Sequence, residues 1–281
     1  SRLLPVKPGE LGLRQSDAVF SHTKSLPELS GRLFSHIRGM EIEAVGVSTR
    51  PRAVEGSYMP CFLVGYSHAK LLSEAFHVPL VEVSHQQGHI AAALWSAGRL
   101  ELMDAPFLSW HLSGGTTELL LAEPEGRNVK CTKIGGTTDI SAGQLIDRTG
   151  QLLGLPFPSG KHLDALSGEA EKKDKFRVKC GNSSFSLSGM QNKVTQYFEQ
   201  GNSPADTAAF ALRCVAGAVY QATGQALKAY PGLPVLFSGG VASNSMLRQW
   251  MAPLDPIFAQ PQYSTDNAMG VAVLAGRLTE V

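Results

Sequence analysis

The stretch PVLFSGGVASN, residues 234–244, contains a short apolar run, a pair of glycines and a small polar end in direct succession. The apolar run predicts a buried strand, and the residues from Ser245 onward predict a helix. A Gly-rich loop between a strand and a helix places the N–H groups of the helix N-terminus at a bound anion. The stretch therefore favours an α/β fold with a ligand-binding loop at the end of a strand.

A second pair of glycines lies in LSGGTT, residues 112–117. Apolar runs at residues 107–112 and 118–122 flank it and predict a β-hairpin whose turn is residues 113–116. Paired glycines allow positive φ and bring backbone N–H groups close to a phosphate, and the neighbouring hydroxyls add donors. A tight β-turn without a ligand explains this loop equally well when it is considered alone.

Two imidazoles lie in SHQQGH, residues 84–89, directly after an apolar run. His85 and His89 have the spacing i, i+4, so on a helix their rings point from the same face and can share one metal ion. Such a site needs a further ligand, often a carboxylate, and Asp266 in the motif TDN is the candidate. The alternatives are two hydrogen-bonded structural histidines and, for Asp266, the N-cap of the last helix. A metalloprotease is excluded because the motif HExxH needs a glutamate where this chain has Gln86.

The remaining apolar patterns alternate between strands and helices. Residues 42–48 and 79–83 predict two neighbouring parallel strands, joined by a helix over residues 59–76. Further helices are predicted over residues 26–37, 85–95, 205–230 and 268–278, and from residue 139 onward. This order predicts two α/β halves with a boundary within residues 122–140.

The composition fits a well-buried α/β protein. Hydrophobic residues make up 43% and charged residues 17% of the 281 residues, which argues against disorder. The net charge of +1 gives no overall attraction to nucleic acid, so an RNA partner would need a local basic patch. No apolar run approaches the roughly 18–20 residues that span a bilayer, so we expect no membrane partner. The 4 cysteines are widely spaced, without a CxxC pair, and indicate reduced thiols in a cytoplasmic protein.

In their order along the chain, these motifs resemble the TsaD family of tRNA threonylcarbamoyladenosine transferases, once called O-sialoglycoprotein endopeptidases. The resemblance runs from about Leu3 to the C-terminus. The family motifs HxEGH, SGGHT, GGVxxNxxLR and TDN are similar to residues 85–89, 113–117, 239–248 and 265–267. The further family motifs DDAAGEAFDK, LLGLxYPGG and FSFSGLK are similar to residues 139–148, 152–160 and 185–191.

The resemblance implies a two-lobed, actin-like ATPase fold of the α/β class, which the family shares with Hsp70 and sugar kinases. The N-terminal lobe, residues 1–130, would carry the HxxGH metal motif and the SGG loop. The C-terminal lobe, residues 131–281, would carry the GGVxxN loop and the aspartate ligand. We expect a nucleotide to bind between the two halves, over both glycine pairs.

The resemblance also implies roles for individual residues. One divalent metal ion per subunit, iron or zinc, would be held by His85, His89 and Asp266. A nucleotide, as ATP, ADP or an acyl-adenylate, would contact a larger set together with its threonylcarbamoyl group. That set comprises Leu112, Ser113, Gly114, Gly115, Thr116, Asp147, Gly160, Gly240 and Asn244. Within it, Asp147 and Gly160 would contact the ribose.

The implied reaction is the metal-dependent transfer of a threonylcarbamoyl or related acyl group from an adenylate to a tRNA adenosine. TsaB-like and TsaE-like partner subunits, or self-association, are expected with it. The alternative is a non-catalytic or regulatory nucleotide-binding subunit of the same ATPase fold that partners a family member. An enzyme would lose metal and activity together when His85 is replaced, whereas a binding subunit would keep its partner affinity.

The chain departs from the family pattern at several positions. Gln87 replaces the glutamate of the metal motif, Thr116 replaces the histidine of the SGGHT loop, and residues 54–58 replace a GPG-type loop. These changes alter the charge and the proton-transfer options of the site and suggest a paralogue with a shifted substrate. The family's opening strand hairpin, GIETSCDET, would precede Ser1, so we expect the natural protein to carry further residues there.

The one basic run is KKDKFRVK, residues 172–179. A solvated loop or an edge strand is the expected structure. Local positive charge also binds tRNA phosphates, so Lys172, Lys173 and Lys175 are candidate contacts to the acceptor.

Overall fold

The computed structural model describes residues 13–263 and 267–279. Their contacts separate two compact units, and each unit is described by itself. The first comprises Ser1–Trp95, Glu125–Asn128 and Asp266–Val281, and the second comprises Ser96–Pro124 and Val129–Thr265. The sequence led us to expect a different division, into an N-terminal lobe of residues 1–130 and a C-terminal lobe of residues 131–281. This division refers to the lobes of the family fold, and it stays a prediction.

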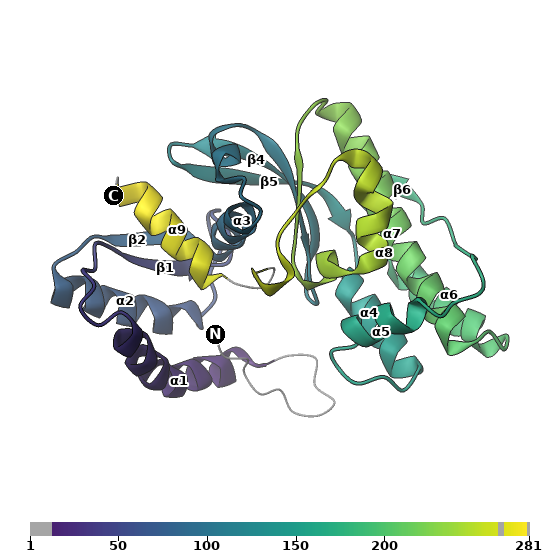
Figure 1. The fold of residues 1–281 in the computed structure, drawn as a ribbon, viewed down its shortest axis with the longest axis horizontal. Coiled ribbons are helices and arrows are strands. Elements are labelled where there is room, and N and C mark those ends of the chain that lie inside the picture. The colour runs from purple at the N-terminus through teal and green to yellow at the C-terminus, as the bar shows by residue number, and fades with distance from the viewer. Residues whose placement is uncertain (1–12, 264–266, 280–281) are drawn as a thin grey trace. The chain divides into compact units, whose positions relative to one another are not determined.

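A 2-stranded parallel sheet forms the centre of the first unit. Strands β1 (Val45–Arg50) and β2 (Leu80–Ser84) pair in parallel, and helix α2 (Phe62–Phe76) connects them, which confirms the predicted βαβ unit. Helices α2 and α9 (Ala268–Thr279) contact both strands. Figure 1 shows α9 beside β1 and β2, so the last helix of the chain packs on strands from near its beginning.

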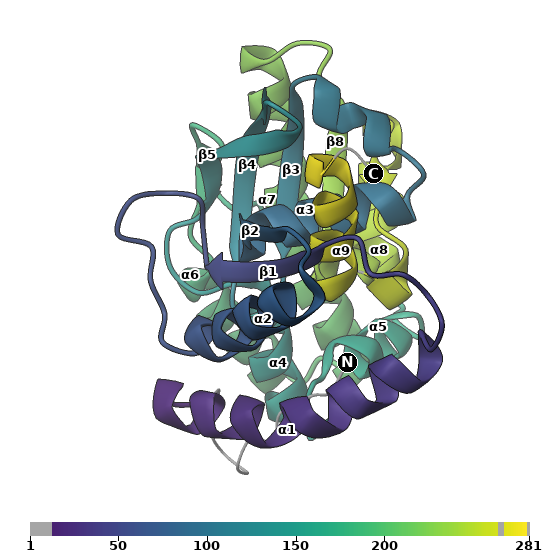
Figure 2. The ribbon, with the colours of Figure 1, turned by 90° about the vertical axis from the view of Figure 1, so that its left-hand side faces the viewer.

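Helix α1 (Gln15–His36) packs on α2 and has no buried residue. Figure 2 shows α1 running beneath α2, and the rings of Phe34 and Phe76 join the two helices with centroids 5.9 Å apart. The helix is longer than the one predicted over residues 26–37, because its first half is mostly polar and shows no clear helical period of apolar residues.

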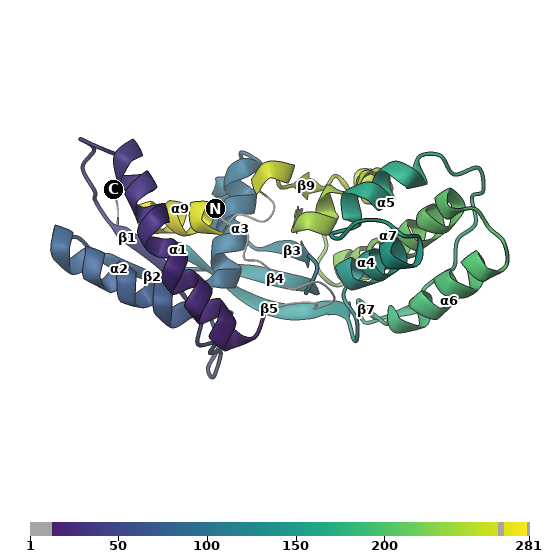
Figure 3. The same ribbon diagram turned by 90° about the horizontal axis from the view of Figure 1, so that it is seen from below.

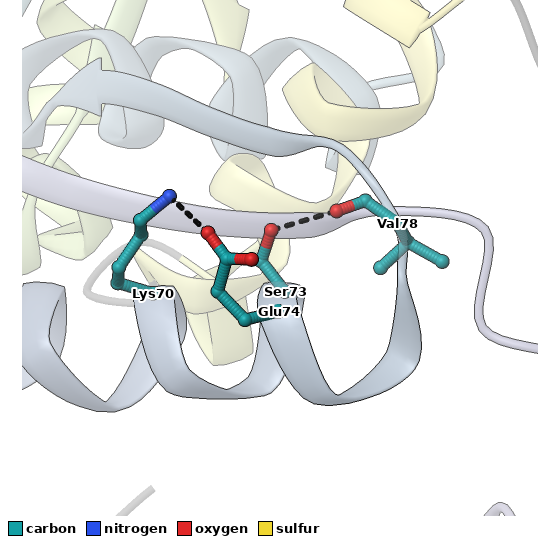
Figure 4. Close-up of polar contacts among 4 residues, drawn as sticks. All are labelled: Lys70, Ser73, Glu74 and Val78. Carbon is teal, nitrogen blue, oxygen red and sulfur yellow. Dashed lines mark hydrogen bonds and ion pairs between the residues drawn. The ribbon is translucent and has the colours of Figure 1, made fainter.

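Helix α2 ends at a left-handed residue, His77, whose φ is 55°. Close to this end, the Ser73 hydroxyl donates to the carbonyl of Val78 at 2.7 Å, which holds the turn that leads into β2 (Figure 4). Lys70 and Glu74 form an ion pair on the same helix, with Nζ and Oε1 2.5 Å apart (Figure 4). Exposed ion pairs of this kind contribute little to stability. The hydrogen bond from Ser73 to Val78 is the contact that shapes the turn.

A larger sheet forms the second unit, with the strand order β6-β7-β5-β4-β3-β8-β9. The central strands β3 (Phe107–Leu112) and β4 (Thr117–Glu125) are antiparallel, which confirms the predicted hairpin, and β8 (Val235–Ser238) runs parallel to β3. The other strands are β5 (Asn128–Thr137), β6 (Cys180–Gly181), β7 (Ser184–Phe185) and β9 (Ile257–Phe258).

Helices pack on the face of this sheet that carries Trp110. They are α4 (Ala142–Leu152), α5 (Gly160–Ser167), α6 (Ser188–Glu199), α7 (Pro204–Ala229) and α8 (Ser245–Met251). Helix α7 contacts the other four and lies among them in Figure 3, and Thr223 of α7 accepts a hydrogen bond from Trp110 Nε1 at 2.9 Å. Within the part of the chain that the structure describes, no helix is long and apolar enough to cross a membrane.

The patterns in the sequence did not predict β5 or α6. Strand β5 lies where the boundary between two halves was expected. Its buried residues are Val129, Gly135 and Gly136, so Val129 supplies its one buried apolar side chain. Helix α6 buries just Met190 and Val194. Both elements need few apolar side chains, so neither leaves a clear hydrophobic period in the sequence.

Candidate functional site

Helix α3 (His85–Ser96) begins directly after β2 and carries both predicted histidines. Ser84 precedes the helix, and its hydroxyl accepts a hydrogen bond from the backbone N–H of Gln87 at 3.2 Å. In return, Gln87 Oε1 accepts from the backbone N–H of Ser84 at 2.9 Å and from its hydroxyl at 3.0 Å. This reciprocal arrangement is a capping box, which fixes the start of the helix and with it the positions of His85 and His89.

His85 and His89 lie side by side, with their Nε2 atoms 3.0 Å apart and their ring planes at 81°. Two imidazole nitrogens lie at this distance when one donates a hydrogen bond to the other or when both bind one cation. Nitrogen ligands about 2.0–2.1 Å from one divalent ion lie about 3 Å apart when they are at right angles, so the pair fits a metal ion. Burial lowers the pKa of His85, and a hydrogen bond with Asn267 opposes this shift in part. The neutral ring, which is the form that binds metals, is therefore favoured.

The third predicted ligand, Asp266, lies outside the described residues. Asn267, the last residue of the TDN motif, donates from Nδ2 to the backbone carbonyl of His85 at 2.7 Å and accepts from Ser48 Oγ at 2.8 Å. In residues 13–263 and 267–279, no group of three His, Cys, Asp or Glu side chains forms a metal site. The convergence of all three predicted ligands on one ion stays a prediction.

Glycines allow Asn267 and α9 to approach the helix that carries the histidines. A Cβ atom on Gly88 would lie 2.5 Å from Asn267 Nδ2, and one on Gly270 would overlap the carbonyl oxygen of Gly88. A Cβ atom on Gly46 of β1 would lie 2.9 Å from Val271 Cγ1 of α9. Helix α9 therefore approaches both α3 and β1 at distances that only a residue without a side chain permits.

The two glycine pairs lie next to each other in the second unit. Strands β3 and β8 run parallel with His111 opposite Ser238, so their carboxyl ends meet at the same edge of the sheet. Gly239 has a φ of 90°, and a Cβ atom there would overlap the carbonyl oxygen of Leu112. The two loops are therefore in contact at the carboxyl ends of two neighbouring strands, which is where α/β sheets bind their ligands.

The SGG loop is fixed on one side and open on the other. Ser113 Oγ accepts from the N–H of Thr116 at 3.1 Å, and the carbonyl of Gly114 accepts from Ser141 Oγ at 2.6 Å. Ser141 is the N-cap of α4, so the N-terminus of this helix lies against the loop. A Cβ atom on Gly114 or Gly115 would meet nothing within 4 Å. Open glycines beside a helix N-terminus suit a phosphate group.

Asp147 and Gly160, the predicted ribose contacts, are brought together by Ser159. The backbone N–H of Ser159 donates to Asp147 Oδ1 at 2.8 Å, and Gly160 is the first residue of α5. Burial raises the pKa of Asp147, and the hydrogen bond from Ser159 opposes this rise. A Cβ atom on Gly160 would meet nothing within 4 Å. The pair thus combines a carboxylate acceptor with an open stretch of backbone.

Asn244 has a structural role at the start of α8. Its Oδ1 accepts from the N–H of Leu247 at 2.9 Å and caps α8, while its Nδ2 donates to Asp164 Oδ1 at 2.8 Å. Ser245 also donates to Asp164, from its N–H at 3.0 Å and its hydroxyl at 2.8 Å. Gly240 begins the short turn that leads from β8 to Asn244. A contact between Asn244 and a nucleotide stays a prediction.

A sequence profile described as TsaD, tRNA N6-adenosine threonylcarbamoyltransferase, matches residues 13–273. The chain belongs to the TsaD family. Curated proteins described as tRNA N6-adenosine threonylcarbamoyltransferase from Enterococcus faecalis and Carboxydothermus hydrogenoformans are each 34% identical to it, over 220 and 267 residues. These matches cover 75% and 89% of this chain, and the chain spans 60% of the first relative and 75% of the second.

Solved structures of HypF resemble the chain in fold. HypF from T. kodakarensis has a TM-score of 0.60 at 14% identity, covering 92% of this chain and 43% of that one. Full-length HypF in a phosphate- and nucleotide-bound form has a TM-score of 0.58 at 13% identity, covering 84% and 55%. At these identities the similarity shows the fold alone, and it confirms the predicted α/β class with the actin-like ATPase fold.

The departures from the TsaD motifs differ in their structural setting. Gln87 stands where the family has glutamate, and it is buried, with its carbonyl oxygen directed to Ser84. A glutamate could accept the same hydrogen bonds, so the change removes a buried charge and keeps the capping box. Thr116 lies in the SGG loop and provides a hydroxyl where the TsaD motif has an imidazole.

The structure reveals further polar residues that were not predicted as parts of the TsaD site. Asp139 accepts hydrogen bonds from the hydroxyls of Ser186 at 2.5 Å and Ser188 at 2.7 Å, at the start of α6. Burial would raise the pKa of Asp139, but these bonds hold it well below its usual range. His111 lies directly before the LSGG sequence, with Nδ1 3.4 Å from Ser238 Oγ. Its position beside the glycine loop is the signal in the sequence that could have identified it.

Proposed function

We propose that this chain is a metal-dependent transferase that moves a threonylcarbamoyl or related acyl group from an adenylate to an adenosine of tRNA. The observation that carries the proposal is the contact between the two glycine loops, where Gly239 lies against Leu112 beside the open Gly114 and Gly115. Membership of the TsaD family supports the transferase chemistry. Because the chain spans 60% of the E. faecalis relative, the activity, substrates and partners of the whole protein are proposals.

The adenylate would bind in the second unit. Backbone N–H groups of Gly114, Gly115 and Gly240 would donate to its phosphate oxygens, and the N-terminus of α4 behind the loop would stabilise their negative charge. Asp147 would accept a hydrogen bond from a ribose hydroxyl beside Gly160. In an acyl-adenylate the phosphate connects the ribose to the acyl group, so these contacts would leave the acyl group at the SGG loop.

His85, His89 and Asp266 would hold one divalent ion, iron or zinc, in the first unit. The separation of 3.0 Å between the two Nε2 atoms supports this assignment. A bound ion would supply positive charge, which is the means by which divalent metals polarise a carbonyl group and stabilise negative charge developing on it. The residues of the chain do the positioning, because the capping box of Ser84 and Gln87 holds both rings at the start of α3.

Mass spectrometry of tRNA nucleosides from cells with and without the gene tests the acceptor and the transferred group. We expect threonylcarbamoyladenosine, or an adenosine with a related acyl group, to decrease when the gene is deleted. Wild-type protein should restore it, and the His85→Ala variant should not. An unchanged nucleoside profile in cells that normally produce the protein would contradict the transferase proposal.

A second candidate is a non-catalytic nucleotide-binding subunit that associates with TsaB-like or TsaE-like proteins or with itself. The observation in its favour is that Gln87 and Thr116 lack the ionisable groups of the family motifs. A pull-down with purified partners separates the two candidates. Partner affinity that survives His85→Ala, together with no transfer by the wild-type protein, would favour the binding subunit.

A further inference from the structure

The basic segment, residues 172–179, runs along α7 from the first turn of this helix to near its last. At one end the backbone N–H of Lys172 donates to Asp206 Oδ1 at 2.8 Å. Just beyond the other end, the backbone carbonyl of Cys180 accepts from Gln225 Nε2 at 3.0 Å. Asp206 and Gln225 lie about 28 Å apart along the helix axis. The segment reaches at most about 26–29 Å, so it follows the helix in an extended conformation.

Further contacts hold the segment between these two ends. The backbone carbonyl of Asp174 accepts from Arg213 Nη1 at 3.1 Å, and Arg177 Nε donates to Gln221 Oε1 at 3.3 Å. Val178 is buried. The segment is therefore fixed on α7 before any partner arrives, which lowers the entropic cost of binding.

The charge of the segment is strongly positive. Five of its side chains are cationic, and Asp174 carries its only carboxylate, which accepts from the hydroxyl of Tyr197 on α6 at 2.7 Å. Four exposed cations stand at alternate positions, Lys173, Lys175, Arg177 and Lys179. Alternate residues of an extended chain are about 6–7 Å apart. The segment thus presents positive charge at regular intervals, which complements the regularly spaced phosphates of a nucleic-acid strand.

Phe176 adds an aromatic ring to this row of cations. The residue is 40% exposed, and Lys193 Nζ of α6 lies 4.5 Å from the ring centroid. Burial raises the pKa of the Cys214 thiol to about 11, and a hydrogen bond with the backbone of Phe176 opposes this rise, so this backbone lies against α7. Exposed aromatic rings among cations are typical of proteins that bind single strands, because the rings stack on bases while the cations meet phosphates.

We propose that residues 172–179 form a binding surface for single-stranded RNA, in which Phe176 stacks on an unpaired base and the neighbouring cations contact successive phosphates. The inference rests on the proposed function, because it names the part of the chain that holds the tRNA acceptor. Bases in a paired stem are stacked on each other and offer no face to a side chain. The surface therefore selects the loops and ends of tRNA over its stems.

The test compares Phe176→Leu with a matched control, Phe20→Leu, in the full-length protein. Phe20 on α1 is 65% exposed, and Lys24 Nζ lies 5.4 Å from its ring centroid, so it is also an exposed phenylalanine beside a lysine. Fluorescence anisotropy at several salt concentrations measures the binding of a labelled RNA strand of about 12 nucleotides. The same strand is then measured in a duplex with its complement.

We expect Phe176→Leu to weaken binding of the single strand at least about fivefold without changing its salt dependence, because a base stack is lost and no charge is removed. Binding of the duplex, and binding of the single strand by Phe20→Leu, should stay within about twofold of wild type. Lys173→Gln should instead reduce the salt slope for the single strand by about 0.7, since one phosphate contact is lost.

Each outcome decides a different point. A wild-type single-strand affinity in Phe176→Leu would overturn the inference, and so would an equal loss with the duplex or in Phe20→Leu. If Phe176→Leu fails to fold, ultraviolet crosslinking of wild-type protein to RNA containing iodouridine decides, because crosslinks confined to residues outside the segment would overturn the inference. The expected binding pattern with an unchanged nucleoside profile after gene deletion would overturn the proposed function alone. Transfer by the wild-type protein with unaffected RNA binding in the variants would overturn the RNA surface alone.

Discussion

At the scale of single residues, Gln87 takes the place of the glutamate in the family motif HxEGH and keeps the start of α3 intact. Its side chain completes the capping box with Ser84 and lies within the protein, where a neutral amide needs no compensating charge. The role of residue 87 in this chain is to start α3 and so to orient His85 and His89.

Replacing Gln87 with alanine removes the acceptor of the buried Ser84 N–H. We expect the free energy of unfolding to fall by about 1–2 kcal/mol, because a helix cap and a buried hydrogen bond are lost. Urea unfolding measures this difference. Gln86→Ala in the same turn is the matched control and should change stability by less than about 0.5 kcal/mol. Equal losses in the two variants would contradict the capping role.

Removing either imidazole of the His85 and His89 pair should reduce metal binding. We expect His85→Ala and His89→Ala each to lower the bound iron or zinc at least about tenfold, because each ring is one of few ligands. Elemental mass spectrometry of folded, purified protein measures the metal content. The control is His68→Ala on α2, whose ring bonds the carbonyl of Val64 at 2.8 Å. A wild-type metal content in either site variant would count against the predicted metal centre.

At the scale of helices and strands, close packing of α9 on α3 holds Asn267 at His85. Two glycines of α9, Gly270 and Gly276, allow the effect of close packing on stability to be separated from the effect of helix propensity. A Cβ atom on Gly270 would overlap the backbone of Gly88, whereas one on Gly276 would meet nothing within 4 Å.

Gly270→Ala should therefore destabilise the protein by about 1–3 kcal/mol through overpacking. Gly276→Ala should stabilise it by up to about 1 kcal/mol, because alanine favours a helix more than glycine does. Thermal and urea unfolding measure both changes. Opposite signs would confirm the close approach of α9 to α3, and a stabilising Gly270→Ala would refute it.

The basic segment, residues 172–179, is an irregular stretch attached to α7, in agreement with the loop that the sequence predicts. The backbone N–H of Lys172 donates to Asp206 Oδ1 at 2.8 Å, and Val178 is buried. Lys175 Nζ lies 5.7 Å from the ring centroid of Trp250. The segment is anchored by its backbone and by one apolar side chain, while its cations are exposed and able to contact phosphates.

Changing Lys172, Lys173 and Lys175 to glutamate should weaken tRNA binding and reduce its dependence on salt, since fewer counterions are released. AMP affinity should stay unchanged. The control reverses the same number of charges elsewhere, at Lys24, Lys130 and Lys228. Filter binding at several salt concentrations measures the effect. An unchanged tRNA affinity at low salt would leave the segment as a solvated loop.

At the scale of the whole molecule, the second unit alone contains both glycine loops, Asp147 and Gly160. A nucleotide should therefore stabilise this unit, by about 2.7 kcal/mol at a concentration 100 times its dissociation constant. Hydrogen exchange with and without AMP tests this. We expect protection of the loops after β3 and β8 and of the first turns of α4 and α5. Protection confined to the first unit would contradict the assignment.

Local patterns in the sequence were sufficient for most strands and helices of the site. The apolar runs before the SGG loop and before Gly239 became β3 and β8, and the run before His85 became β2, because alternation and turn residues act over a few neighbouring positions. The i, i+4 spacing likewise predicted that His85 and His89 would share a helix face. Strand β5 and helix α6 were missed because they bury too few apolar side chains to produce a pattern.

The meeting of distant segments was decided only in the tertiary structure. Asn267 bonds His85 across 182 positions, and Ser238 contacts His111 across 127. These contacts depend on which strands are neighbours in the sheet and on how closely α9 approaches α3. Strand order and backbone approach result from packing between segments far apart in the chain, so no local pattern contains them.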